Sequence, residues 1–269
     1  MGARPERSLA RWHSRPELSV LDIDATLLAA SSDKEQAAGT FKGGYGHHPL
    51  LCFLDGTGEA LAGVLRPGNA GSNTASDHKM VLDLALAQLD RQALEGQILV
   101  RADGAGATHE LCVYCREAGL RFSFGFDVDE RIREAIIAMP ESAWIKAIRR
   151  DGSQREHSRV CEITDSVDLS SWPDGMRLIA RSTQLSDGDQ QSFADHDGCR
   201  LAVFITDQPD NDIAQLDLTH RGHARVEDRI RQGKDCGLSN LPFRSFAHNQ
   251  VWPWLSQLAQ DLILGTAAV

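Results

Sequence analysis

The 269-residue sequence contains no long apolar run and few basic residues. A membrane-spanning helix needs about 20 consecutive apolar residues, and no stretch approaches that length, so no membrane span is expected. The first residues, 1–7, include basic side chains but no apolar block follows them, which argues against a secretory signal and favours a cytoplasmic location. Lys and Arg number 28 against 38 Asp and Glu, for a net charge of −10. This balance counts against a simple nucleic-acid-binding protein, because neutralising phosphates requires basic side chains.

The signatures of several enzyme classes are also missing. The glycines at 43–46 do not follow an expected strand, and Gly104–Ala105–Gly106 lacks the third glycine of a dinucleotide-binding turn. No G-x-S-x-G nucleophile motif occurs. Among the six cysteines, Cys112 and Cys115 form a lone C-x-x-C with no second pair, whereas a structural zinc site needs four ligands. Free thiols are therefore expected.

Hydrophobic patterning predicts a regular series of elements in the first half of the chain. Apolar and β-branched runs predict strands, and apolar residues at helical spacing predict helices. The expected strands are 18–24, 49–54, 60–65, 98–103 and 120–126, and the expected helices are 75–90 and 107–118. The order is β-β-β-α-β-α-β, which is typical of a ribonuclease H-like fold, an α/β fold with a mixed sheet.

Residues 127–212 interrupt this series. Helices are expected near 129–138 and 140–149, followed by strand-like runs at 157–164, 176–183 and 199–206 with turn-rich sequence between them. Helical spacing returns at 220–236 and 249–264. We therefore expect one ribonuclease H-like domain from 18–126 and 213–269, an inserted β-rich subdomain at 127–212, and a tail or remnant of an upstream region at 1–17.

Carboxylates from distant parts of the chain are the candidate site. Asp22 and Asp24 lie two apart on the first strand and share a face. Asp103 ends the fourth strand, which neighbours the first in a ribonuclease H-like order, and Glu227 lies on a late helix. Three such carboxylates suit Mg²⁺ or Mn²⁺, and a pair of these ions activates a water or 3′-hydroxyl against a phosphodiester. Asp103, which precedes a glycine, also fits a plain turn or helix cap.

Several segments resemble those of DDE-type bacterial insertion-sequence transposases. Residues 18–28 resemble the strand of the first aspartate with its D-x-T ending, and residues 100–106 resemble the block of the second. Residues 220–234 resemble the signature Y-x2-R-x3-E-x6-K. Glu227 and Lys234 match this signature, whereas His220 and His223 stand at its Tyr and Arg positions. Weaker matches lie at 48–51, 65–70, 241–243 and 246–252, so the similarity covers most of residues 18–264.

The resemblance implies a function and a set of site residues. Asp24, Asp103 and Glu227 would be the catalytic residues and would hold two Mg²⁺ or Mn²⁺ ions, with Asp22 as the alternative first aspartate. The activity would be DNA cleavage and strand transfer at transposon ends. The partners would be the terminal inverted repeats and target DNA, on which a homo-oligomer is expected, within a bacterial cytoplasm and its nucleoid.

The late helix also carries the expected DNA contacts. Basic side chains cluster between 220 and 234 in an otherwise acidic chain, which favours phosphate binding beside the carboxylates. We expect contacts from His220, His223, Arg225 and Lys234. The alternative for this helix is a solvated surface with intrahelical ion pairs.

A second function remains open. Transposases of this type carry a DNA-end recognition region upstream, and here about 17 residues precede the first aspartate strand. The chain is therefore expected to be truncated, and the alternative is a catalytically inactive remnant that at most binds DNA. A missing basic region would also account for part of the negative charge.

Overall fold

The computed structural model describes residues 18–30, 33–90, 97–186, 188–190 and 195–266. The tail predicted at 1–17 lies outside these residues. Within the described part, no helix combines the length and apolar character needed to cross a membrane.

One large sheet runs through the molecule. Its strand order is β6-β5-β1-β7-β8-β13-β11-β10-β9, and β12 pairs with β13. The strands are β1 (Leu18–Ala25), β5 (Leu50–Leu54), β6 (Ala60–Val64), β7 (Gln97–Ala102), β8 (Arg121–Phe126), β9 (Ile145–Ile148), β10 (Gln154–Glu162), β11 (Arg177–Gln184), β12 (Asp195–His196) and β13 (Cys199–Thr206). β5 is antiparallel to both β1 and β6, whereas β7 is parallel to both β1 and β8. The mixed sheet expected for a ribonuclease H-like fold is thus formed by β6, β5, β1, β7 and β8.

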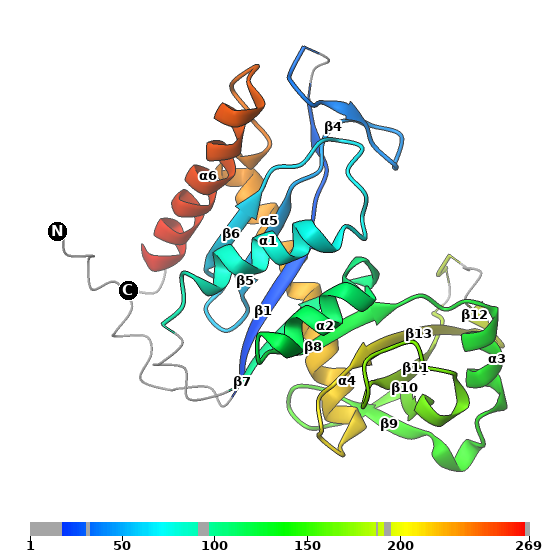
Figure 1. Ribbon diagram of the computed structural model, residues 1–269. Helices are drawn as coiled ribbons and strands as arrows, with labels where there is room; N and C mark the ends of the chain where they lie inside the picture. The colour runs from blue at the N-terminus through cyan, green and yellow to red at the C-terminus, as the bar shows by residue number, and fades with distance from the viewer. Residues whose placement is uncertain (1–17, 31–32, 91–96, 187, 191–194, 267–269) are drawn as a thin grey trace.

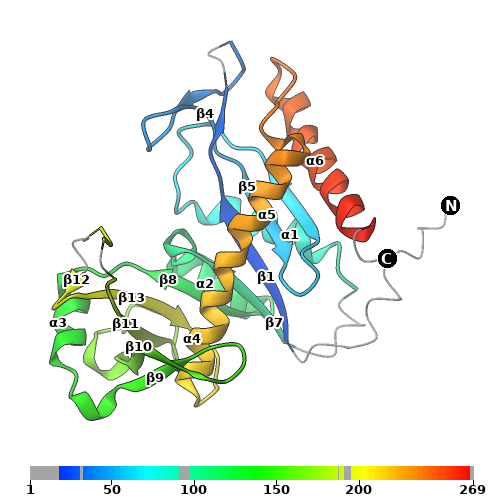
Figure 2. The same cartoon turned by 180° about the vertical axis from the view of Figure 1, so that it is seen from behind.

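Helices cover both faces of the sheet. They are α1 (Ala75–Leu86), α2 (His109–Glu117), α3 (Glu130–Ala138), α4 (Ile213–Arg221), α5 (Arg225–Gly233) and α6 (Phe246–Thr266). α1 and α2 lie on the face seen in Figure 1, and α4 and α5 run along the opposite face in Figure 2. α6 packs beside β6 and α5.

The alternation of side chains along β1 determines which face of the sheet its two aspartates point toward. Leu21 and Ile23 are buried in the core beneath α1 and α2, together with residues of β7 and β8. Because successive strand side chains face opposite sides, Asp22 and Asp24 point toward the face covered by α5. On that face Val226 and Ile230 of α5 pack against β5 in a second core. The hydrophobic pattern of β1 therefore turns its carboxylates toward the late helix.

The region expected to be a loop at 29–48 contains a small sheet. Its strands are β2 (Leu28–Ala29), β3 (Ala38–Gly39) and β4 (Tyr45–His47), in the order β2-β4-β3. The chains approach so closely that a Cβ on Gly46, where φ is +157°, would lie 1.9 Å from the carbonyl oxygen of Leu28. The glycine-rich composition that suggested a loop thus serves tight strand pairing instead.

In the later half, one expected helix is wrong, and a second is confirmed as helical but with different bounds. The helix expected at 140–149 is a short 3₁₀ turn, Glu141–Ala143, followed by β9, because residues 145–148 pair with β10. The helix expected at 220–236 begins earlier, at Ile213, where the Asp212 carboxylate accepts hydrogen bonds from Ala214 N (3.0 Å) and Gln215 N (3.2 Å). It is then broken by a 3₁₀ turn, Gly222–Ala224, before α5.

The strands of residues 127–212 extend the main sheet. β13 pairs antiparallel with β8, and β11, β10 and β9 follow outward. α3 packs Ile132 and Ile136 against one side of this extension, and α4 packs Leu216 against Ile179 and Phe204. Strand pairing is continuous from β8 into β13, so the domain boundaries at 126/127 and 212/213 stay a prediction.

Candidate functional site

The three predicted acidic residues line one pocket of about 600 Å³, together with Lys234. Asp24 lies near the end of β1, and Asp103 directly follows β7. Ile23 of β1 is paired with Ala102, the last residue of the parallel strand β7. Asp24 directly follows Ile23, and Asp103 directly follows Ala102. Glu227 comes from the first turn of α5. Strand register and helix packing therefore bring together residues that are up to about 200 positions apart.

The two aspartates are oriented by nearby backbone groups. Oδ1 of Asp24 accepts a hydrogen bond from the N–H of Ala25 (2.7 Å). Oδ1 of Asp103 accepts one from the N–H of Ala105 (2.9 Å) and so caps the 3₁₀ turn at 104–106. The capping role considered for Asp103 is thus real, and it coexists with a place in the pocket. Asp103 and Glu227 are exposed, whereas Asp24 is half-buried.

Burial and neighbouring charge make Asp24 hard to ionise. Burial raises the pKa of Asp24 to about 6, with further contributions from the charges of Asp103 and Glu227, against opposing effects of His223 and the Ala25 N–H. A cation beside these carboxylates would relieve the repulsion, and an all-oxygen donor set suits Mg²⁺ or Mn²⁺. Among the described residues, however, no three acidic, histidine or cysteine side chains already form a metal-ligand set. Metal binding therefore stays a prediction.

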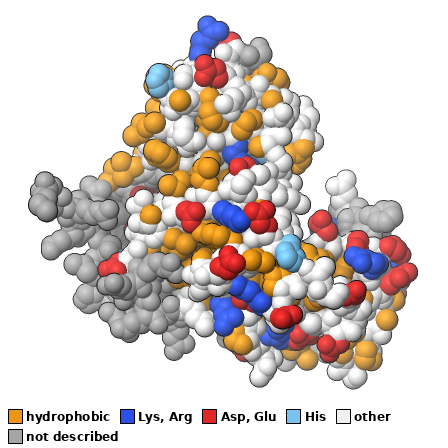
Figure 3. Space-filling model, viewed as in Figure 1, with side chains coloured by type: hydrophobic (Ala, Val, Ile, Leu, Met, Phe, Trp, Pro, Cys, Tyr) orange, Lys and Arg blue, Asp and Glu red, His pale blue; other side chains and the backbone are white. Residues whose placement is uncertain are grey.

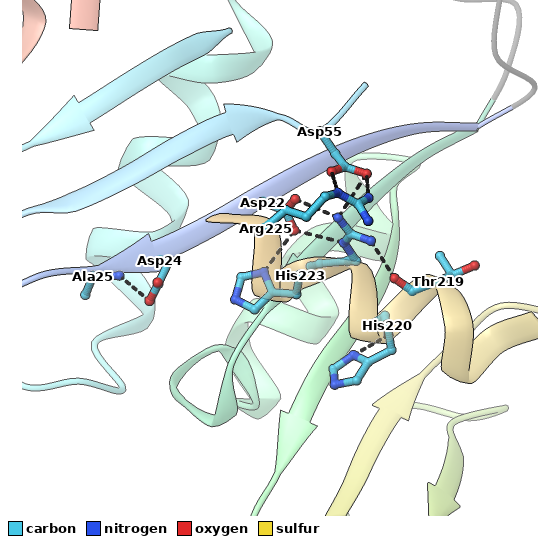
Figure 4. Close-up of polar contacts among 10 residues, drawn as sticks. Asp22, Asp24, Ala25, Asp55, Thr219, His220, His223 and Arg225 are labelled. Atoms are coloured by element: carbon cyan, nitrogen blue, oxygen red, sulfur yellow. Dashed lines mark hydrogen bonds and ion pairs between the residues drawn. The ribbon is translucent and has the colours of Figure 1, made fainter. Parts of the chain in front are cut away.

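Asp22, the alternative first aspartate, is committed elsewhere. Its carboxylate is 2% exposed and accepts two hydrogen bonds from Arg101, Nε to Oδ1 at 2.8 Å and a terminal nitrogen to Oδ2 at 2.6 Å. Nδ1 of His223 lies 2.9 Å from the same Oδ1. Figure 4 shows this cluster, with Asp24 apart from it beside Ala25. Of the two aspartates, Asp24 lines the pocket and Asp22 anchors a buried ion pair.

Arg101 is the centre of a network that the sequence did not reveal. Besides Asp22, its guanidinium contacts the carboxylate of Asp55 at 3.2 Å and donates to the carbonyl oxygen of Thr219 in α4. Asp55 in turn binds Arg225 of α5 through both carboxylate oxygens. Burial opposes ionisation of Asp55, but the hydrogen bonds from Arg225 and the charge of Arg101 hold its pKa below the usual value.

This network ties the late helix to the sheet. It joins β1, β7, the turn after β5, the end of α4 and the start of α5, two residues before Glu227 (Figure 4). A signal for it was present, because Arg101 stands in the apolar run 98–102 and a buried charge requires a partner. Its partner Asp22 is the residue paired with it across β1 and β7.

Two of the four expected DNA contacts are engaged in this network. His223 binds Asp22 and its side chain is 13% exposed, whereas Arg225 binds Asp55 and its side chain is 34% exposed. Their charged or polar ends are therefore largely used within the protein. Their predicted contacts with DNA stay predictions.

The other two expected contacts differ from each other. The His220 ring stacks on Phe204, with centroids 4.4 Å apart, and its Nδ1 lies 2.9 Å from Oγ of Ser123. Burial, followed by the charge of Arg181, lowers the pKa of His220 well below its ordinary value, so the ring is neutral at pH 7. Lys234, in contrast, lines the pocket and has no ion-pair partner among the residues that the structure describes. Lys234 is thus the expected contact with an uncommitted charge.

Comparisons with known proteins place the chain in a family. None of the curated proteins compared with it matches. Among solved structures, it is similar to the piggyBac transposase in a synaptic complex with hairpin DNA, at 12% identity and a TM-score of 0.48. That alignment covers 92% of this chain and 47% of the piggyBac chain, so this chain spans about half the length of the solved protein. The family model described as "Transposase DDE domain group 1" matches residues 5–266. The chain therefore belongs to the group 1 family of transposase DDE domains.

Proposed function

We propose that this chain cleaves DNA at transposon ends and transfers the cut strand, with Asp24, Asp103 and Glu227 as the catalytic carboxylates. The observation that carries the proposal is that all three line one pocket, together with Lys234. Family membership supports the reaction class. Divalent cations bound there, Mg²⁺ or Mn²⁺ and two in number, would supply Lewis-acid stabilisation of the attacking and leaving oxygens.

The roles of the protein groups follow from their charges. The three carboxylates supply oxygen ligands and concentrate negative charge, which disfavours the approach of bare phosphate. Lys234 supplies a positive charge in the same pocket and is suited to hold a phosphate oxygen. The Arg101 network fixes α5 against β1 and β7 and so keeps Glu227 at the pocket.

The remaining features of the proposal concern partners. The substrate is duplex DNA, comprising the terminal inverted repeats and the target. A transposon has two ends, and the described residues bring the three carboxylates together at one pocket, so we propose a homo-oligomer on DNA. We place the reaction in a bacterial cytoplasm, in an insertion-sequence element.

The test compares neighbouring residues of one helix. The full chain is incubated with supercoiled plasmid DNA and MgCl₂ or MnCl₂, and nicked and linear products are measured over time. Glu227→Gln is expected to lower cleavage by at least about 100-fold, because it removes one carboxylate of the site. Asp228→Asn is the matched control, since Asp228 is exposed, pairs with Arg231 and lies outside the pocket. Asp103→Asn retains a cap acceptor for Ala105 and is expected to lose cleavage without loss of fold.

The outcomes separate the two functions. Cleavage that requires the cation and disappears in Glu227→Gln but not in Asp228→Asn supports the catalytic proposal. Binding of DNA without any cleavage by the unaltered chain, with either cation, would favour the inactive DNA-binding remnant.

A further inference from the structure

The turn that joins β3 to β4 presents an aromatic side chain and a lysine to solvent. The N–H of Thr40 donates to the carbonyl oxygen of Gly44 (2.8 Å), and the N–H of Gly43 donates to that of Thr40 (3.0 Å). Gly43 has a φ of +82°, a left-handed conformation that favours glycine. Phe41 and Lys42 therefore lie at the middle of a closed turn. Phe41 is 66% exposed, more than any other large hydrophobic residue in the described part of the chain.

The small sheet holds this turn in place. Strand β4 pairs with both β2 and β3, and Figure 1 shows the small sheet projecting beyond the end of the main sheet. Tyr45, at the start of β4, is also exposed, but its hydroxyl donates to the carbonyl oxygen of Ala37 (2.7 Å). The two exposed aromatic residues therefore differ, because Tyr45 stabilises the small sheet whereas Phe41 lies on the turn beyond it.

Phe41 packs on a fixed histidine. The rings of Phe41 and His48 have centroids 5.3 Å apart and planes inclined at 53°. His48 is buried, and its carbonyl oxygen accepts a hydrogen bond from Nε of Arg66 (2.9 Å). Burial, followed by the charge of Arg66, lowers the pKa of His48, so its ring is neutral at pH 7. The Phe41 ring thus has support from the protein on one side and remains accessible elsewhere.

The same turn lines the acidic pocket. Phe41, Lys42 and His48 line the pocket that holds the three proposed catalytic carboxylates and Lys234. The Lys42 ammonium lies 5.7 Å from the centroid of the Phe41 ring. Lys42 has no ion-pair partner in the part of the chain that the structure describes. An accessible aromatic ring and an uncommitted positive charge therefore stand together at the place of the proposed cleavage.

This pair of side chains matches the two parts of a nucleotide. The chain carries a net charge of −10, and acidic and basic side chains are interspersed on the face that carries α1 and α2 (Figure 3). A lysine at the pocket is suited to a phosphate, and an aromatic ring is suited to the face of a base. Both faces of a base within a duplex are covered by its neighbours, so only a base outside the stack can meet an aromatic side chain.

We propose that Phe41 stacks on an unpaired base beside the cleaved phosphodiester, and that Lys42 binds the phosphate of that nucleotide. This inference rests on the proposed function for the identity of the DNA, but it concerns recognition rather than cleavage. Stacking on an aromatic ring is tolerant of base identity, so the turn selects an unpaired nucleotide and not a sequence. Phe41 is a positioning residue, which holds the DNA strand at the carboxylates.

The test separates bases from backbone. In EDTA, which removes the cations needed for the proposed cleavage, the full chain is mixed with a labelled duplex that ends in a fork of about four unpaired bases per strand. A second duplex carries the same fork with abasic sites, so the two DNAs have equal charge. Fluorescence anisotropy gives the two dissociation constants. The unaltered chain is expected to bind the fork with bases about 5- to 100-fold more tightly, the range of one stacked base.

The variants test the ring and the charge separately. Phe41→Ala is expected to remove the preference for bases, whereas Phe41→Trp is expected to keep it because tryptophan also stacks. Lys42→Gln is expected to weaken binding of both forks by a similar factor, since it removes a phosphate contact. Phe243→Ala is the matched control. Phe243 is 46% exposed and contacts His248, but it lies outside the pocket, so the preference is expected to stay.

Thermal unfolding of each variant reports its fold. The inference is overturned if the unaltered chain binds both forks equally or binds neither, if Phe41→Ala keeps the preference, or if Phe243→Ala removes it too. A preference that depends on Phe41, with no cleavage by the unaltered chain in MgCl₂, would support stacking and contradict the proposed catalysis. Cleavage without any preference for bases would do the reverse.

Discussion

Replacing Asp24 by asparagine is expected to stabilise the metal-free protein at neutral pH while removing the carboxylate proposed to hold a cation. The pKa of Asp24 in the folded protein is about 6, against an ordinary value of 3.8. Ionising this group in the folded state therefore costs about 3 kcal/mol more than in the unfolded chain. Asparagine carries no charge and keeps an oxygen that can accept from the Ala25 N–H.

The size of the stabilisation expected from Asp24→Asn depends on pH. Below about pH 3 the carboxyl is protonated in both states, so the penalty is absent and the two proteins differ little. As the pH rises through about 6, the folded protein loses its preferential protonation, and the penalty becomes complete. The gain from Asp24→Asn is thus expected to approach about 3 kcal/mol at pH 7.5 and to fall to about 1 kcal/mol at pH 4.5.

Urea unfolding in EDTA at the two pH values measures this difference. Addition of MgCl₂ at pH 7.5 is expected to narrow it, because a cation that binds the folded native site stabilises only the unaltered protein. Asp174→Asn, at an exposed turn, is the control and is expected to show no pH-dependent gain. A variant that is less stable than the native protein at pH 7.5, or a gain equal at both pH values, would refute the reasoning.

Three further substitutions test other features of the fold. Arg101→Lys is expected to lower the free energy of unfolding in urea by about 3 kcal/mol, because a lysine cannot bridge two aspartates and a carbonyl at once. Gly46→Ala is expected to cost at least about 1 kcal/mol in the same measurement, since its Cβ would meet the carbonyl of Leu28. Burial raises the pKa of Asp261 to about 6. Asp261→Asn, which keeps an acceptor for the Ala60 N–H, is therefore expected to stabilise the protein at pH 7.5 by about 1 kcal/mol in thermal unfolding, allowing for solvent screening.

The first half of the fold was predictable because its strands are apolar runs with clear breaks. The strands expected at 49–54 and 120–126 form at 50–54 and 121–126. The strand at 145–148 was not predictable in the same way. Its sequence also has helical spacing, and its conformation is set by pairing with β10, a long-range contact that local patterning does not contain.

The candidate site, too, could be predicted from the sequence only in part. The convergence of Asp24, Asp103 and Glu227 on one pocket was anticipated from motif spacing and strand order. What could not be anticipated is which basic residues the protein uses for itself. Arg225 serves Asp55, and His223 serves Asp22, because the turn after β5 and the inner face of β1 lie next to α5 only in the folded chain.

The Arg101 network also bears on when the acidic pocket can form while the chain is being synthesised. Asp22, Asp55 and Arg101 emerge early, but the guanidinium gains its carbonyl partner only when Thr219 has been made. Arg225, which neutralises Asp55, follows six residues later, and Glu227 two residues after that. The acidic pocket is therefore among the last features a nascent chain can complete. An interrupted translation product lacking the late helix would retain two of the three carboxylates, but would lack Glu227 and Lys234, which line the pocket.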